Sequence, residues 1–338
     1  MVSKIIKEYR DQKPYQIAPA PDVEHLPKVR GYDFEKQFNL NAFLESYGTT
    51  GFQATHFARA VEIIEEMRKE NATIFLGYTS NMVSSGIREI IKYLVKNKMV
   101  HVLVTTAGGV EEDIIKTLKP FAIGLFNVSG RSMFEKGINR TGNIFIPNDR
   151  YLYFEKFINP FLDRLYAEQK QGKVHTPSDI ARELGKEIDS EQNHEDSILY
   201  WAYKNNIPVF CPALTDGSFG DLVYFMKQRH PDFNIEIAGD TKKIVDCALN
   251  AEKAGAIILG SGVAKHFILN ANIFREGVEY AVYINTAEEY DGSDSGAQTE
   301  EAITWGKIKT TAQHVKVHAD ATIIFPLLVL ATFGKKEE

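Results

Sequence analysis

The sequence predicts an α/β fold with a mostly parallel sheet and helices on both faces. Three observations lead to this prediction. Short β-rich runs are mostly continuous rather than strictly alternating in polarity, as is typical of strands buried on both faces. Helical patterns lie between these runs, and strand–helix alternation is typical of parallel sheets. A turn of small polar residues follows nearly every run, at the position where such sheets bind ligands.

The expected strands and helices follow one another through residues 56–318. The strands are Thr73–Tyr78, Val100–Thr105, Ile207–Phe210, Asn234–Ile237, Ala256–Leu259, Tyr280–Ile284 and Val315–His318. The clearest helical periodicity lies in His56–Glu70 and Ser84–Lys98, where apolar residues recur every three or four positions. Asp240–Ala254 continues the series. Thr176-Pro177 followed by Asp179 is a typical helix start, with proline in the first turn.

The turns after the expected strands indicate a class of ligand. They are Thr79–Asn81, Thr105–Gly109, Leu214–Ser218, Gly260–Gly262, Asn285–Ala287 and Ala319–Ala321. The carboxyl ends of parallel strands meet at one edge of the sheet, where helix N-termini favour phosphate groups. We therefore expect a nucleotide-type ligand at this edge. Tight connections alone would account for some of the turns.

The net charge of the chain limits the kinds of ligand and partner that we expect. The 338 residues include 39 Lys and Arg against 45 Asp and Glu, which gives a net charge of −6. Non-specific nucleic-acid binding needs a basic surface, so we expect no nucleic-acid partner. A cationic ligand is compatible with this charge.

The cysteine content and the apolar runs bear on the compartment. Cys211 and Cys247 are too few for a disulfide framework or a zinc site, and they suit a reducing compartment. The N-terminus shows no apolar core of signal-peptide length. The longest apolar run, Ile323–Phe333, contains a proline and is shorter than the ~20 residues of a membrane span. We expect a soluble, cytoplasmic protein without a membrane partner.

Residues 1–30 differ in composition from the rest of the chain. Pro14, Pro19, Pro21 and Pro27 interrupt regular structure, and only Lys4–Arg10 is amphipathic enough for a short helix. We interpret residues 1–30 as an N-terminal arm, with a frayed terminus as the alternative. Residues 31–338 are expected to form one domain, because no linker, repeat or low-complexity segment divides them.

Several standard motifs are absent. Gly260-Ser261-Gly262 begins a G-x-G pattern, but Lys265 occupies the third glycine position of a dinucleotide fingerprint. The sequence contains no P-loop, no H-E-x-x-H and no Cys/His cluster, so we expect no P-loop NTPase and no metal site. Gly292–Gly296 reads G-S-D-S-G, which is not a hydrolase nucleophile motif.

Acidic residues are concentrated in the same loops. Glu111 and Glu112 follow the Thr105–Gly109 turn, Asp216 and Asp221 flank a Gly-Ser-Phe-Gly segment, and Asp291 and Asp294 share a glycine-rich loop. Such carboxylates suit the ammonium groups of a polyamine, and they suit helix capping equally well.

Two further segments contain residues suited to catalysis. Trp305 and Lys307 flank Gly306 after the acidic loop. An indole face holds organic cations, and a desolvated lysine forms Schiff bases. A core tryptophan beside a surface lysine explains the same pair. His266 is open to two interpretations, as a catalytic base or as a half-buried structural histidine.

The motifs taken together resemble one family. They are Thr73–Asn81 (TIFLGYTSN), Val104–Asp113 (VTTAGGVEED), Pro212–Ser218 (PALTDGS), Asp291–Ala297 (DGSDSGA), Trp305–Ile308 (WGKI) and Phe325–Leu328 (FPLL). In this order they resemble deoxyhypusine synthase. The similarity extends from about Val29 to Phe333, through Arg30–Phe34 and Tyr47–Ala54.

The resemblance implies a fold, a cofactor and a reaction. It implies a Rossmann-like sheet, NAD as cofactor, and a homotetramer with active sites at the interface between paired subunits. Enzymes of this family oxidise spermidine and release 1,3-diaminopropane. They transfer the 4-aminobutyl group to one lysine of the translation initiation factor 5A precursor.

The resemblance also implies roles for individual residues. Lys307 would be the nucleophile that carries the butylimine, and His266 the general base at the amine that loses hydride. The polyamine would be held by Glu111, Glu112, Asp221, His266, Gly292, Ser293, Asp294, Glu301 and Trp305. The dinucleotide would be lined by Ser80, Asn81, Met82, Val83, Ser84, Thr106, Ala107, Gly108, Glu112, Asp216, Ser261, Thr286, Ala287, Asp291, Asp320 and Ala321.

The sequence departs from the family pattern at two places. Ser261 stands where the family commonly has glycine, which adds a hydroxyl near the expected cofactor. Lys4–Arg10 is short for the helix that plugs a neighbouring subunit's entrance in the family.

Three other functions are compatible with parts of the sequence. A homospermidine synthase would transfer the same butyl group to putrescine with nearly identical residues. A non-catalytic regulatory paralogue is disfavoured by the presence of Lys307, His266 and Glu112. A sirtuin-like NAD-consuming deacylase is disfavoured because the chain lacks a four-cysteine zinc ribbon.

Overall fold

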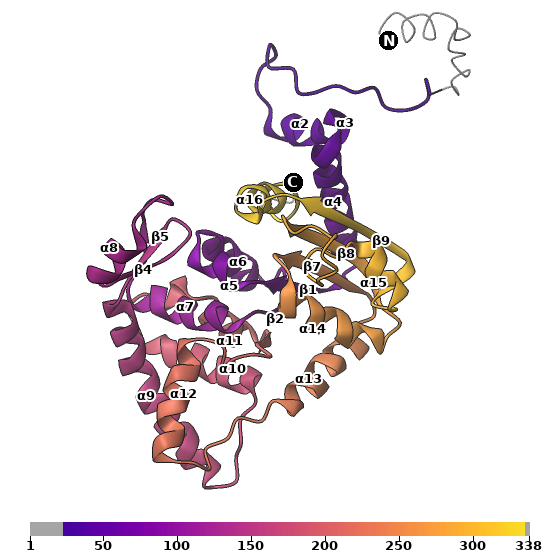
Figure 1. The fold of residues 1–338 in the computed structure, drawn as a ribbon. Coiled ribbons are helices and arrows are strands. Elements are labelled where there is room, and N and C mark those ends of the chain that lie inside the picture. Colours follow the sequence, from indigo (N-terminus) through magenta and orange to yellow (C-terminus); the bar gives the residue numbers. More distant parts are fainter. Residues whose placement is uncertain (1–22, 335–338) are drawn as a thin grey trace, which may run out of the picture.

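The computed structural model describes residues 23–334 and is built around one six-stranded parallel sheet (Figure 1). The strand order is β6-β2-β1-β7-β8-β9, and every neighbouring pair is parallel. The strands are β1 (Thr73–Tyr78), β2 (Val102–Val104), β6 (Val209–Phe210), β7 (Ala254–Leu259), β8 (Val278–Asn285) and β9 (Ile308–His318). The α/β fold with a mostly parallel sheet is therefore confirmed.

Helices cover both faces of this sheet (Figure 1). The first face packs against α4 (Phe52–Lys69), α6 (Ile87–Lys96), α7 (Ala107–Leu118) and α16 (Ala321–Thr332). The second face packs against α13 (Ala238–Leu249), α14 (Gly262–Ile273) and α15 (Thr299–Thr304). The first core continues into α9 (Asp149–Gln169), α10 (Pro177–Glu187), α11 (Ile198–Asn205) and α12 (Ser218–Arg229).

Two hydrophobic cores result from the alternation of side chains along each strand. Leu76 and Ile257 belong to the core on the first face, whereas Phe75 and Ile258 belong to the core on the second. Successive side chains of a strand point to opposite faces, so a strand covered on both faces must be apolar at every position. The continuous apolar runs in the sequence reflect this double burial.

Shorter elements complete the described chain. They are α2 (Leu40–Glu45), α3 (Tyr47–Thr50), α5 (Ser80–Ser84), α8 (Gly130–Glu135), the 3₁₀ turns η1 (Ile188–Ser190) and η2 (His194–Asp196), and the strands β3 (Ala122–Ile123), β4 (Ile138–Thr141) and β5 (Ile144–Pro147). The last three form an antiparallel sheet of order β3-β5-β4, which the sequence analysis did not predict. The short helix expected at Lys4–Arg10 lies outside the described residues.

Three local predictions were wrong. Asn234–Ile237 forms no strand, because its N–H groups bond elsewhere: Asn234 donates to the Gln169 side chain and Glu236 to the carbonyl of His175. The expected helix Ser84–Lys98 is interrupted at Ser85, which is extended and whose hydroxyl accepts from the N–H of Ile87. The helix expected to reach Ala254 ends at Leu249, and Ala254 begins β7.

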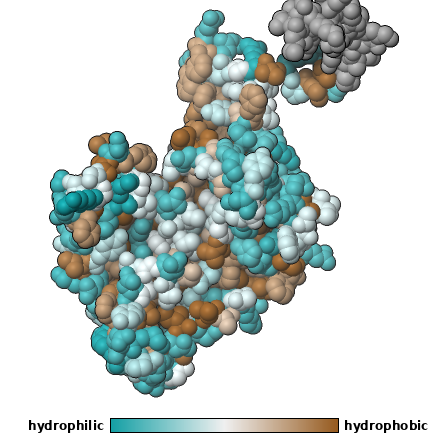
Figure 2. Space-filling model, in the orientation of Figure 1, coloured by the Kyte–Doolittle hydropathy of each residue, from teal (hydrophilic) through white to brown (hydrophobic). Residues whose placement is uncertain are grey.

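The segment around α2 and α3 projects from the body and leaves apolar side chains exposed (Figures 1 and 2). Phe34 is 75% exposed and Phe52 is 97% exposed. Tyr32, Phe43 and Tyr47 nevertheless pack edge-on against neighbouring aromatic rings in this segment. Aromatic contacts therefore hold this segment together, but a single chain leaves several of its apolar side chains exposed to solvent.

A buried ion pair ties α6 and α7 to α11. Asp113 is fully buried and accepts hydrogen bonds from Arg88 Nε at 2.7 Å, from the Ser197 hydroxyl at 2.6 Å, and from the N–H groups of Ile198 and Leu199. Asp113 thus caps the first turn of α11 and pairs with the guanidinium of Arg88, which is 3% exposed.

Asp113→Ala is expected to lower the free energy of unfolding by about 3–5 kcal/mol, because it leaves the buried Arg88 guanidinium with only the half-exposed Glu89 as an ionic partner. Urea denaturation followed by circular dichroism measures this change. Asp196→Ala is the matched control: it removes an exposed ion pair with Lys92 and is expected to change stability little. Equal effects of the two substitutions would contradict the role given to Asp113.

Within residues 23–334, no helix has the length and apolarity needed to cross a bilayer. The same residues contain no cluster of three His, Cys, Asp or Glu side chains arranged to hold a metal ion. Both cysteines are free thiols, with Cys211 buried and Cys247 partly exposed.

Candidate active site

The residues expected to line a dinucleotide lie mainly at the carboxyl edge of the parallel sheet. Ser80–Ser84 follow β1, Thr106–Gly108 follow β2, and Ser261 follows β7. Thr286 and Ala287 follow β8, Asp320 and Ala321 follow β9, and Asp216 lies beyond β6. All six strands point the same way, so their carboxyl ends form one edge of the sheet.

Neighbouring turns at this edge are held in close contact. The N–H of Ser80 donates to the Thr106 hydroxyl at 3.0 Å, which joins the turns after β1 and β2. A Cβ on Gly108 would lie 2.6 Å from the Ser80 Cβ, so only glycine allows this approach. Gly260 likewise allows a close approach: its φ is +81°, and a Cβ there would overlap the Thr79 hydroxyl oxygen.

The carboxyl edge has the groups that a dinucleotide needs. The N-termini of α7 and α14 have no side-chain cap and no acidic residue in the first turn, so their N–H groups are available to phosphate oxygens. A Cβ on Gly262, at the start of α14, would meet nothing within 4 Å. The exposed carboxylate of Asp216 is an acceptor suited to ribose hydroxyls. These residues fit NAD.

Two expected polyamine carboxylates on α7 differ in their surroundings. Burial raises the pKa of Glu112 to about 7, although the Ser84 hydroxyl donates to its carboxylate and opposes this shift. Glu111 is also buried, and burial raises its pKa. The Glu111 carboxylate accepts the N–H of Phe219 at 2.9 Å, in the first turn of α12. Glu112 is therefore the carboxylate with the freer oxygen atoms, and Glu111 caps α12.

Asp221 is exposed on α12 and lines a cavity of about 290 Å³. Tyr151 and Glu155 of α9 line the same cavity. The charges of Glu112 and Glu111 contribute to raising the pKa of Tyr151, although burial is the larger cause. The sequence analysis missed both α9 residues because no motif connects α9 to the acidic loops. We refer to Glu111, Glu112 and Asp221 as the α7–α12 group.

The remaining expected polyamine residues lie around α14 and α15. This α14–α15 group comprises His266, Gly292, Ser293, Asp294, Glu301, Trp305 and Lys307. His266 is exposed on α14, and its Nδ1 lies 3.0 Å from the Asn270 amide nitrogen. Asp291 accepts the N–H of Ser293 at 2.8 Å and so lies in the loop of this group rather than in the turns after the strands.

Two buried lysines hold the loop that carries Asp294. Lys265 is 1% exposed, donates to the Asp294 carbonyl and lies 3.5 Å from the Asp294 carboxylate. Lys316 donates to the carbonyls of Ala287 at 2.9 Å and Gly296 at 2.6 Å, near the two ends of the loop. Burial lowers the pKa of both lysines. The chain closes tightly at Gly296, where a Cβ would overlap the carbonyl of Glu288.

Lys307 is 9% exposed and lies just before β9. Its Nζ is 5.7 Å from the centroid of the Trp305 ring, and it makes no hydrogen bond or ion pair with any residue of the described range 23–334. Gly306 between them has φ of +67°, a conformation that glycine adopts without strain. The amine is thus sheltered without being neutralised by a carboxylate.

The two groups lie on opposite faces of the sheet. α7 and α12 contribute to the core on the first face, and α14 and α15 to the core on the second. The Lys307 carbonyl accepts the N–H of Val278, at the amino end of β8. The eight residues of β8 separate Lys307 from the turn at Thr286 by about 23 Å. A single chain therefore does not bring Lys307 to its own expected cofactor residues.

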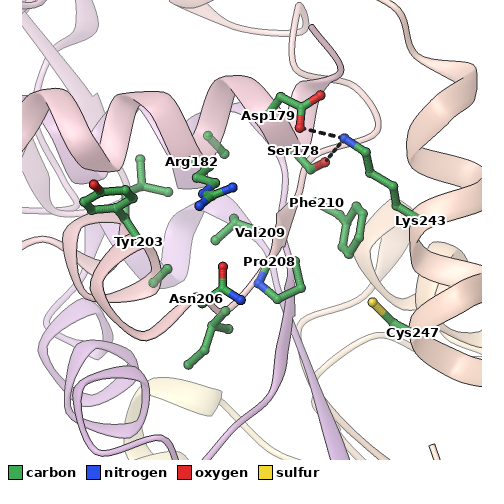
Figure 3. A pocket seen from close by; sticks show the side chains of 14 residues that line it. Ser178, Asp179, Arg182, Tyr203, Asn206, Pro208, Val209, Phe210, Lys243 and Cys247 are labelled. Atoms are coloured by element: carbon green, nitrogen blue, oxygen red, sulfur yellow. Dashed lines mark hydrogen bonds and ion pairs between the residues drawn. The ribbon is translucent and has the colours of Figure 1, made fainter. Parts of the chain in front are cut away.

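A separate cavity of about 270 Å³ lies beside the edge strand β6 (Figure 3). Its lining comes from α10, α11, β6 and α13, and includes Arg182, Tyr203 and Cys247. Lys243 and Asp179 form an ion pair at its rim (Figure 3). None of the expected site residues lines this cavity.

The chain is similar to proteins of one family over most of its length. The family model described as deoxyhypusine synthase matches residues 42–332. A deoxyhypusine synthase of Musa acuminata is 49% identical, with 93% of this chain and 89% of the relative covered. One of Caenorhabditis elegans is 47% identical, with coverages of 91% and 90%. A crystal structure of an Entamoeba histolytica protein assigned as a deoxyhypusine synthase has a TM-score of 0.68 and 31% identity, and covers 92% of this chain and 98% of that one.

Proposed function

Because the chain belongs to the deoxyhypusine synthase family, we propose that it transfers the 4-aminobutyl group of spermidine to one lysine of the translation initiation factor 5A precursor. The observation that carries this proposal is the Nζ of Lys307, which is sheltered, lies over an indole ring and has no described carboxylate partner. An amine in these surroundings suits attack on a polarised carbon–nitrogen bond.

The proposed reaction has two amine exchanges, and both occur at Lys307. The turns at the carboxyl edge would hold NAD, which would supply a hydride acceptor for the oxidation of spermidine and the hydride for the final reduction. The Lys307 amine adds to the oxidised carbon, the bond to 1,3-diaminopropane breaks, and the butylimine remains on Lys307. The acceptor lysine then adds to the same carbon and displaces Lys307. His266 takes the proton from the spermidine amine that is oxidised.

Carboxylates from both groups would bind the ammonium groups of spermidine. Glu112 and Asp221 would pair with ammonium groups from one side, and Asp294 and Glu301 from the other. Trp305, which is 66% exposed, offers a ring face to the cation or its methylene chain. Glu111, engaged with α12, would act mainly by keeping Glu112 and Asp221 in place.

We propose further that two copies of the chain pair to complete each site. The α7–α12 group and the turns after β1 and β2 of one copy would face the α14–α15 group of the other. The opposite placement of these groups in one chain supports this arrangement. The exposed aromatic residues around α2 and α3 are one surface that a second copy would cover. Pairing of two such dimers would give the homotetramer implied by the family resemblance.

Mass spectrometry of a reconstituted reaction tests the proposed function. The purified protein is mixed with spermidine and NAD, and then with the purified factor precursor. The expected result is free 1,3-diaminopropane and an added aminobutyl group on one acceptor lysine. Putrescine as sole acceptor is the comparison: a faster reaction with putrescine than with the precursor would assign homospermidine synthesis instead. Absence of diaminopropane under all conditions would contradict the proposal.

Spermidine binding is expected to weaken as the pH falls below about 7. Glu112 has its pKa raised to about 7, and only its ionised form attracts an ammonium group. The affinity should therefore fall toward tenfold per pH unit on the acid side and level off above pH 8. Titration calorimetry between about pH 5.5 and about pH 8.5 measures the profile. Glu112→Gln should bind weakly at every pH, and an unchanged acid limb in this variant would contradict the assignment to Glu112.

A further inference from the structure

Lys116 lies on α7 one turn after Glu112 and is half-buried. Its Nζ donates to the carbonyls of Val83 at 2.8 Å, Ser84 at 3.4 Å and Ser85 at 2.9 Å. These carbonyls lie at the C-terminal end of α5, where a helix has acceptors without intrahelical partners. Lys116 thus caps the C-terminal end of the short helix that contains the expected cofactor residues Ser80–Ser84.

Ser84 is held between two residues of α7. Its hydroxyl donates to the Glu112 carboxylate, and its carbonyl accepts from Lys116. Glu112 and Lys116 are four residues apart, so their side chains lie on the same side of α7. Ser84 is 4% exposed, and its hydroxyl therefore has little freedom to turn toward solvent. A displacement of α5 would move this hydroxyl away from Glu112.

Lys116 forms no ion pair with a described residue. No carboxylate within residues 23–334 lies within ion-pair distance of its Nζ, although Glu89 of α6 and Asp113 of α7 are near enough to act on it electrostatically. Burial lowers the pKa of Lys116. Neutral carbonyl acceptors leave the positive charge free to act on Glu112 across one helical turn.

We propose that Lys116 is a positioning residue for polyamine binding, which holds the Ser84 hydroxyl against Glu112 and supplies a positive charge beside that carboxylate. The inference rests on the proposed function, in which Glu112 pairs with an ammonium group of spermidine. It extends the site to a residue that touches neither substrate nor cofactor.

The positive charge of Lys116 lowers the pKa of Glu112. The groups that face Glu112 are Ser84 of α5, Glu111 and Lys116 of α7, and Tyr151 of α9. Burial and the charge of Glu111 raise the pKa of Glu112, whereas the Ser84 hydroxyl and the Lys116 charge lower it. Removing the charge of Lys116, or releasing Ser84, must therefore raise this pKa further and shift spermidine binding to higher pH.

Lys116→Met and Lys116→Gln test the inference through the pH profile of spermidine affinity, measured by titration calorimetry on the full-length protein. Both variants are expected to move the midpoint of the acid limb upward by at most about one pH unit, with up to about tenfold weaker binding near neutral pH. The affinity should recover at high pH. Lys116→Gln keeps a hydrogen-bond donor for the α5 carbonyls, so it covers the case in which the methionine variant does not fold.

Lys116→Arg and Lys119→Met are the comparison variants. Arginine keeps the charge and several donors, so its midpoint should stay near that of the wild type. Lys119, three residues further along, forms a partly exposed ion pair with Asp149, and the loss of this pair should leave the profile unchanged.

The outcomes distinguish this inference from the proposed function. A wild-type protein that neither binds nor cleaves spermidine contradicts the proposed function itself. If the wild type binds spermidine but the Lys116→Gln profile coincides with that of Lys119→Met, the positioning role is wrong. Weakening by the same factor at every pH also overturns it, because a merely structural loss would not depend on the ionisation of Glu112.

Discussion

Replacing Lys307 by arginine is expected to reduce aminobutyl transfer by at least about a thousandfold. Arginine retains the positive charge and most of the volume beside Trp305, but a guanidinium does not form an imine under these conditions. The proposed route requires a covalent bond between the residue at position 307 and the butyl carbon. Removal of the amine therefore blocks both exchanges while the binding residues stay in place.

The measurement is the rate at which the acceptor lysine gains mass, with release of 1,3-diaminopropane followed in parallel. Lys309→Arg is the matched control, since Lys309 lies two residues further along β9 and pairs with Glu279. Borohydride reduction of the wild-type reaction should add mass to the peptide that contains Lys307. Transfer by Lys307→Arg at the wild-type rate would contradict the role of Lys307 as the carrier.

Co-assembly of two impaired variants is expected to restore activity when their substitutions lie in different groups. In a dimer of Lys307→Arg with Glu112→Gln, one site combines both substitutions and the other contains neither. Random pairing makes half of the dimers mixed, so about a quarter of the wild-type activity should return. This result follows from the separation of the α7–α12 and α14–α15 groups on opposite faces of the sheet.

The matched control for this experiment combines Lys307→Arg with Glu301→Gln, which belong to the same group. Both sites of the mixed dimer then contain a substituted α14–α15 group, and no gain over the average of the two parent proteins is expected. Activity is assayed after the two chains are co-expressed and the whole mixture of dimers is purified without selection for mixed ones. If neither combination gained activity over the average of its parent proteins, each chain would form its site without the other.

Predictions of the fold were confirmed where the structure of a segment depends on residues close to it in the sequence. The run Thr73–Tyr78 is buried at every position from Ile74 onward because both its faces are covered, and it forms β1 with the predicted bounds. Thr176 and Asp179 form the capping box that starts α10, a bonding pattern contained within four residues. Asn234–Ile237 has strand-like composition, but its N–H groups bond to Gln169 and His175, residues that are distant in the sequence.

The position of the expected cofactor turns could be predicted for the same reason. The cofactor turns could be placed at one edge because parallel strands all end there. Tyr151, Glu155 and Lys116 could not be identified from any motif. The first two meet Asp221 only in the cavity between α9 and α12, and Lys116 bonds to carbonyls at the end of α5. The sequence also could not indicate that Glu111 caps α12 while its neighbour Glu112 has the freer carboxylate.

By itself, the sequence determined the class of fold, the order of the turns at the carboxyl edge and the family resemblance. These depend on periodicity, turn chemistry and motif order, which are local properties of the chain. Only the tertiary structure decided that Glu112 and Lys307 lie on opposite faces of the sheet, with about 23 Å of β8 between Lys307 and the cofactor turn. The face on which a helix packs depends on the crossovers between strands, and these are decided by contacts between residues far apart in the chain.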